Sequence, residues 1–192
     1  GDKPDATLHF KQGKLLAALE KLDALAEGAS FLLGHNLIAF DLPHLSAAKP
    51  DLRLLQLPVV DTLRLNPLAF PRNPYHHLVK HYQDGQLKRG RLNDPLLDAQ
   101  LTLEVFRNQH EALAKTSADL ALAWHWLTTV GSIGSGLDSF FTTLRKHIRP
   151  TDSEAIAAIG RQLAGQACQT HGAAILADAA THGWPLAYAL AW

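Results

Sequence analysis

The sequence of 192 residues contains no methionine and one cysteine, and its positive and negative charges balance. The single Cys168 excludes a disulfide framework and a cysteine-based zinc site, because each needs several cysteines. A net charge of zero argues against a wholly basic protein, although it allows a local basic patch. No apolar run reaches the roughly eighteen residues of a membrane span, and the charged first residues do not resemble a signal peptide. We therefore expect a cytoplasmic protein.

Apolar patterning predicts an α/β arrangement in the first part of the chain. Short apolar or β-branched runs predict strands, and apolar residues at helical spacing predict helices. The predicted order is a strand at 7–10, a helix at 14–27, a strand at 31–34, a helix at 36–48 and a strand at 57–60. Alternating strands and helices are typical of a layered α/β fold.

The pattern changes toward helix in the rest of the chain. Three prolines predict an irregular loop at 66–75, which is followed by a short helix at 76–82, a second loop at 83–92 and a helix at 93–114. Further helices are predicted at 117–130, 137–147 and 153–170. We place a domain boundary near residue 116, with an α/β domain at 1–116 and an α-helical connector domain at 117–192.

Basic residues concentrate between Arg64 and Arg91. This segment contains six lysines and arginines and one acidic residue, Asp84. Such a patch binds the phosphates of nucleic acids, and the alternative is a solvated loop. The residues that we expect to contact a nucleic acid in this region are Arg72, His76, His77, Lys88, Arg89 and Arg91.

Two aspartates stand in positions that suit metal binding. Asp41 closes the segment Gly34-His35-Asn36-Leu37-Ile38-Ala39-Phe40-Asp41, directly after a predicted strand. Asp98 lies near the start of an otherwise apolar helix, where a carboxylate costs desolvation energy unless it is paired or binds a metal. The two could converge as oxygen ligands of Mg²⁺, whereas either alone is more often a helix cap or a surface charge.

Together these segments resemble the DEDD (DnaQ-like) exonucleases over about residues 5 to 112. The resemblance rests on His35-Asn36-x-x-x-Phe40-Asp41, on Val59-Val60-Asp61-Thr62 and on the late helix that bears Asp98-Ala99. It implies an RNase H-like three-layer fold and 3′-5′ hydrolysis of phosphodiesters by two ions, Mg²⁺ or Mn²⁺. It makes Asp41 and Asp98 metal ligands, Asn36 and Phe40 the floor of the site, and Asp61 a structural residue.

The chain departs from the family at two points. No Asp-x-Glu, which supplies two of the family's four carboxylates, occurs before Leu33. We therefore expect the first strands of the family's fold to be missing, and the segment 7–10 fits the third strand of the family's opening meander. Asn93 also stands where the family has the catalytic histidine, and an asparagine holds a water but accepts no proton at neutral pH. His76, His77 or His81 could substitute, although a plain loop or surface role suits them better.

The whole chain, including the segment 65–77, is similar to the region before the motor of certain bacterial RecQ-like helicases. The resemblance implies single-stranded or 3′-ended DNA as partner, together with a downstream helicase motor in the same parent chain. No Gly-x-x-x-x-Gly-Lys-Ser/Thr occurs, so the chain itself is not expected to hydrolyse ATP. The absence of methionine and the apolar last residues then suggest a segment of a longer protein. Removal of an initiator methionine before Gly1 would also explain the absence of methionine.

Three functional interpretations follow. The first is a nuclease-like domain whose site is incomplete here, and the second is a catalytically inactive module that binds DNA or docks the helicase. The third is a helical interaction protein with no role at nucleic acids. In the helical part, Trp124 and Trp126 flank His125, and the pattern favours packing between helices over stacking on bases.

Overall fold

A parallel pair of short strands organises the first half of the chain. The computed structural model describes residues 8, 10, 13–73, 76, 78, 82–83, 86–87, 95–132 and 135–192. Within them, β1 (Leu32–Gly34) pairs in parallel with β2 (Val59–Asp61), and a separate antiparallel hairpin joins β3 (Tyr82–Gln83) to β4 (Gln86–Leu87). The apolar runs at 31–34 and 57–60 therefore form strands as predicted.

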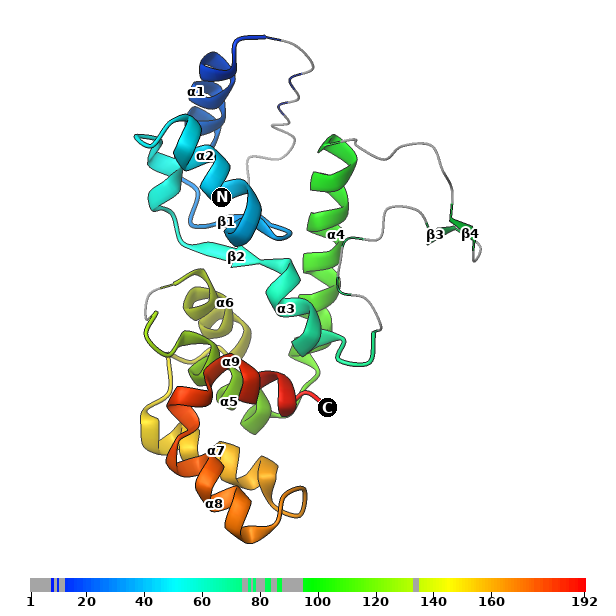
Figure 1. Cartoon of the computed structure of the whole chain (residues 1–192), viewed down its shortest axis with the longest axis vertical. Helices are drawn as coiled ribbons and strands as arrows, with labels where there is room; N and C mark the ends of the chain where they lie inside the picture. Colours follow the sequence, from blue (N-terminus) through cyan, green and yellow to red (C-terminus); the bar gives the residue numbers. More distant parts are fainter. Residues whose placement is uncertain are drawn as a thin grey trace.

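Helices make up most of the described chain (Figure 1). They are α1 Leu15–Leu25, the π-helical turn η1 Leu37–Asp41, α2 Leu42–Ala48, the 3₁₀ turn η2 Arg53–Gln56, α3 Thr62–Ala69, α4 Pro95–Ala114, α5 Ala118–Thr129, α6 Gly136–Arg145, α7 Asp152–Leu163, α8 Gln169–Ala177 and α9 Ala179–Ala189. The chain is thus a mixed α/β protein in which helices dominate.

Helices pack against both strands of the pair. Helix α4 packs on β1 and α3, while α6 packs on β2 (Figure 1). Gly136, the first residue of α6, lies directly on the backbone of Val59, so closely that a Cβ atom there would overlap the Val59 carbonyl group. Only glycine allows α6 to approach the strand in this way.

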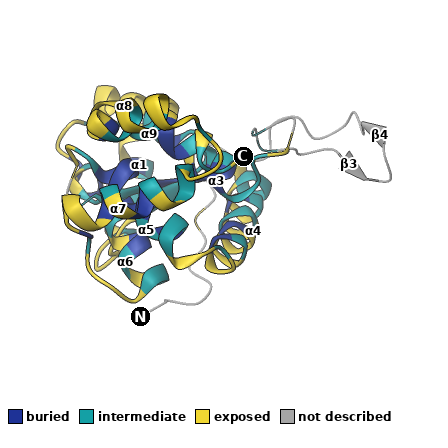
Figure 2. Cartoon of the chain, turned by 90° about the horizontal axis from the view of Figure 1, so that it is seen from below, coloured by how far each residue is buried: buried dark blue, intermediate teal, exposed yellow. Residues whose placement is uncertain are grey.

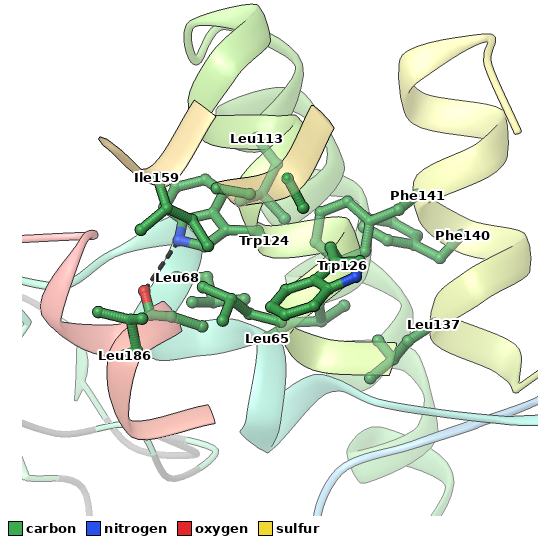
Figure 3. Close-up of a cluster of buried hydrophobic side chains, with 14 of the residues drawn as sticks. Leu65, Leu68, Leu113, Trp124, Trp126, Leu137, Phe140, Phe141, Ile159 and Leu186 are labelled. Atoms are coloured by element: carbon green, nitrogen blue, oxygen red, sulfur yellow. Dashed lines mark hydrogen bonds between the residues drawn. The ribbon is translucent and has the colours of Figure 1, made fainter. Parts of the chain in front are cut away.

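One hydrophobic core runs across the predicted boundary at residue 116. It joins Val60, Leu65 and Leu113 from the first part to Trp124 and Phe141 from the second (Figure 3). Helix α5 lies at its centre and is buried along most of its length (Figure 2). The two predicted domains therefore share a core in this structure.

The two tryptophans of α5 pack between helices, as the sequence predicted. Trp124 and Trp126 are buried, and each indole N–H finds an acceptor inside the fold. Trp124 donates to the Ala187 carbonyl group at 2.8 Å (Figure 3), and Trp126 donates to Asp152 Oδ1 at 2.8 Å.

The loop prediction at 66–75 is wrong for its first four residues, which belong to α3. The Asp61 side chain caps this helix by accepting the Leu63 N–H, and Leu65 and Leu68 are fully buried on its inner face. Capping and burial outweigh the cost of Pro67, which removes one helical hydrogen bond.

Two further elements differ from the predictions. In the predicted strand at 7–10, Leu8 and Phe10 are not in a strand, and Thr7 and His9 lie outside the described residues. In the predicted helix at 76–82, His76 and Leu78 are not helical, and Tyr82 pairs with Leu87 instead, as suits an aromatic residue.

The predicted helix at 153–170 is interrupted. Helix α7 ends at Leu163 and α8 begins at Gln169. Between them, Gly165 adopts a φ of +77°, the left-handed conformation that commonly ends a helix.

Candidate functional site

The candidate site lies where β1 and β2 end. Gly34 pairs with Asp61, and because the strands are parallel, the residues that follow both strands meet at one edge. This edge is where α/β proteins commonly carry their binding sites. It brings together two of the three segments that carry the resemblance to exonucleases.

Asp61 holds this edge together. Its carboxyl group is buried, with 3% of the residue exposed, and it accepts three backbone N–H groups. Oδ1 accepts from Asn36 at 2.8 Å and from Leu63 at 3.0 Å, and Oδ2 accepts from Ile38 at 3.1 Å. Asp61 therefore fixes the chain that leads to Asp41, which is the structural role expected for it.

The backbone geometry before η1 depends on small and polar residues. Asn36 has a φ of +62°, a left-handed conformation that asparagine adopts more easily than most residues. Thr62 donates its hydroxyl hydrogen to the Gly34 carbonyl group at 3.1 Å, so the His35 Nδ1–H donates to Thr62 Oγ1 at 2.9 Å. The segment between β1 and η1 is thus tied to the start of α3 through backbone and side-chain bonds.

Asp41 ends the π-helical turn on the surface of the protein. Partial desolvation, followed by the negative charge of Asp61, raises the pKa of the Asp41 carboxyl group. The neighbouring Phe40 is 58% exposed, and its ring lies 4.6 Å from that of His44. Single π-helical turns occur frequently at functional sites. Asp41 is consequently a carboxylate that a nearby cation would stabilise.

Asp98 belongs to a different element, helix α4. It occupies the first turn of α4, where it is half-buried. The charged groups that act on the Asp41 carboxyl group are Asp61 and His44, and Asp98 is not among them.

The described residues do not assemble a metal centre. No three His, Cys, Asp or Glu side chains within them come together as a possible metal site. Both Asp61 oxygens already accept N–H groups, so this carboxylate is not offered to an ion. The donor set at hand does not fit a two-metal site, and metal binding by Asp41 and Asp98 stays a prediction.

Gln109 is a buried polar residue that sequence reasoning missed. Its Nε2 donates to the Thr62 carbonyl group at 2.8 Å and to Asn66 Oδ1 at 3.0 Å, which ties α4 to α3. Asn66 Nδ2 in turn donates to His76 Nδ1 at 3.1 Å. The available signal was the position of Gln109 in the apolar stripe with Thr102, Phe106 and Leu113, where a polar residue needs internal partners.

The predicted nucleic-acid contacts are described only in part. Arg72 is exposed and His76 is half-buried at the end of the network from Gln109. The remaining predicted contacts lie outside the described residues, and so does Asn93, which is predicted with Asp41 and Asp98 as a catalytic residue. These contacts are His77, Lys88, Arg89 and Arg91.

Comparisons of the chain with protein-family models, curated proteins and solved structures gave no significant match. Among the helices of the described part, none has the length and apolar character needed to span a membrane.

Proposed function

We propose that the chain is a nucleic-acid-binding, exonuclease-like domain of a DNA repair or recombination helicase, with an RNase H-like arrangement and a helical connector. Its expected ligand is single-stranded or 3′-ended DNA, and its expected location is the cytoplasm. The observation that carries the proposal is the contact of Asp61 with the N–H groups of Asn36 and Ile38. This contact joins two separate motifs at the carboxyl edge of a parallel strand pair, as expected for parts of one site.

The electrostatics at this edge agree with a site that meets cations and phosphates. Asp41 lies exposed beside the buried charge of Asp61, and its raised pKa indicates that an added positive charge would favour its ionised form. Mg²⁺ or Mn²⁺ near Asp41 and Asp98 is part of the proposal. Because the described carboxylates are too few for two metal ions, we expect hydrolysis only if an Asp-x-Glu strand completes the site in the parent chain.

A nuclease assay tests the catalytic side of the proposal. The 192-residue chain is incubated with labelled single-stranded DNA and Mg²⁺ or Mn²⁺, and we expect no degradation. Degradation that Asp41→Ala abolishes would show that the site is complete in this chain and would contradict the proposal.

The alternative function is a catalytically inactive module that binds DNA or docks the helicase. It is favoured by Asn93 in the place of the family's histidine. It predicts salt-sensitive DNA binding that survives Asp98→Ala and fails when Lys88, Arg89 and Arg91 are all changed to Gln. If the triple variant binds DNA as well as the wild type, the basic segment has no part in binding. If the wild type gives no mobility shift with DNA at low salt, the helical interaction protein is favoured.

A further inference from the structure

A basic segment ends α6 and leads to α7. It contains Arg145, Lys146, His147 and Arg149 within five residues. Lys146 adopts a φ of +57°, and this left-handed residue turns the chain away from the helix. The segment then reaches Thr151, whose side chain caps α7. The two arginines are half-buried, whereas Lys146 and His147 are exposed.

Buried His125 of α5 holds the first arginine. Arg145 Nη1 donates to His125 Nδ1 at 2.7 Å and to the Ile148 carbonyl group at 3.1 Å. Because Nδ1 accepts this bond, the imidazole proton lies on Nε2, which donates to Asp138 Oδ1 at 2.7 Å. Burial lowers the pKa of His125 and so favours its neutral form, which can accept from Arg145.

A second residue of α5 holds the other arginine. Arg149 Nε donates to Thr129 Oγ1 at 2.9 Å. Thr129 follows His125 by four residues, so both acceptors lie on one face of α5, which α6 and α7 flank (Figure 2). One rigid, buried helix thus positions two guanidinium groups through neutral acceptors.

The positive charges of these arginines are not matched by ion pairs. Among the described residues, neither guanidinium group has a carboxylate within ion-pair distance. The two carboxylates of the same surface region are engaged elsewhere. Asp119 accepts two bonds of 2.7 Å from Arg161, and Glu154 accepts from the N–H and hydroxyl groups of Thr151 at 2.8 Å each. Glu154 acts on Arg145 only through its charge.

Both arginines line a surface cavity of about 680 Å³ between the ends of α4, α5, α6 and α7. Leu122, Leu144 and Pro150 contribute apolar wall to the same cavity. A guanidinium group presents five N–H donors, and these arginines use only part of them inside the protein. The cavity therefore combines the two fixed guanidinium groups with an apolar surface. Asp119 and Glu154 also line it, and they are bonded to Arg161 and Thr151.

We propose that this cavity binds a phosphate group of a nucleic-acid strand, with Arg145 and Arg149 as phosphate ligands and the apolar wall against the adjoining nucleoside. Positioned guanidinium groups suit phosphate oxygens because they form directed, charge-assisted hydrogen bonds. The inference rests on the proposed function in naming a nucleic acid and gives the helical part a role in holding the strand. A free nucleotide or inorganic phosphate carries the same chemistry, and the experiment separates these sources.

The test measures binding of a fluorescein-labelled single-stranded oligonucleotide to the full chain at about 50 mM NaCl. The variant Arg145→Gln/Arg149→Gln removes the charges of both proposed phosphate ligands. The control Lys14→Gln/Lys21→Gln removes the same charge at two exposed positions, the N-cap of α1 and α1 itself, and α1 lies far from α6 (Figure 1). We expect the first variant to bind at least about fivefold more weakly, with the salt slope reduced by about 0.7 per lost phosphate contact. Equal affinities of both variants would overturn the inference while leaving the proposed function in place.

A second readout on the unchanged protein avoids any effect on folding. In ¹⁵N-labelled chain, the arginine Nε–H signals are followed while oligonucleotide, adenosine monophosphate, inorganic phosphate or a polyglutamate peptide is added. We expect the oligonucleotide to shift the Arg145 and Arg149 signals at the lowest concentration. Shifts by phosphate or the nucleotide without DNA binding would keep the phosphate site and refute the nucleic-acid source. Stronger shifts by polyglutamate, or none at all, would overturn the inference.

Discussion

Replacing Asp61 by alanine removes three hydrogen bonds at once from the edge of the strand pair. The N–H groups of Asn36 and Ile38 lose a charged acceptor, and a hydrogen bond to a charged group contributes about 1.5–3 kcal/mol. The third bond caps α3 at Leu63, and such a cap contributes about 1 kcal/mol. Water can reach the half-buried segment and offset part of the loss, so we expect Asp61→Ala to lower the free energy of unfolding by about 3–5 kcal/mol.

Urea denaturation followed by circular dichroism measures this loss. The free energy of unfolding of Asp61→Asn should lie between those of the wild type and Asp61→Ala. The asparagine amide keeps one acceptor oxygen, but its NH₂ group points a donor at backbone N–H groups that need an acceptor. Asp51→Asn is the matched control, since Asp51 is exposed and pairs with Lys49 at the surface. It should change stability by less than about 0.5 kcal/mol. A loss below about 1 kcal/mol for Asp61→Ala would refute the role assigned to this carboxylate.

Four other variants test three separate features of the structure. Gly136→Ala should destabilise by about 2–3 kcal/mol because its Cβ overlaps the backbone of β2, whereas Gly172→Ala, which meets no atom within 4 Å, should stabilise by up to about 1 kcal/mol in the same urea titration. The lowered pKa of His125 means that the unfolded chain binds a proton at this residue more readily than the folded chain. The free energy of unfolding is therefore highest above about pH 6.5 and falls on acidification. His125→Gln should flatten the change in melting temperature between pH 7.5 and 5.5, and an unchanged profile would exclude His125 as its source. Asp41 has a raised pKa, so Asp41→Asn should stabilise at pH 7 with a gain that shrinks toward about pH 4, and a loss at pH 7 would contradict this.

The local sequence pattern was sufficient to predict the helices and strands whose stability depends on residues nearby in the chain. The strands β1 and β2 and the helices α4 and α5 lie where apolar spacing and capping residues place them. Helix α3 was hidden because three prolines suggest a loop, and its stability comes from burial of Leu65 and Leu68 against distant helices. Tertiary packing here outweighs local preference, which a single sequence does not reveal.

The sequence was sufficient to name residues of the candidate site but revealed only part of their geometry. The resemblance assigned Asn36 to the floor of the site and Asp61 to a structural role, and the structure adds that the Asn36 backbone N–H donates to Asp61. The arginine pair of the helical part was missed because its supports, His125 and Thr129, lie about twenty residues away on another helix. Such a site arises only when folding brings α5 against the segment that follows α6.

The salt dependence of DNA binding tests the proposed function most directly. Fluorescence anisotropy of a labelled single-stranded oligonucleotide is titrated with the wild-type chain at several NaCl concentrations between about 50 and 200 mM. We expect saturable binding whose logarithmic affinity falls linearly with the logarithm of the salt concentration, because phosphate contacts release counterions. No rise in anisotropy at the lowest salt concentration would contradict nucleic-acid binding by this protein.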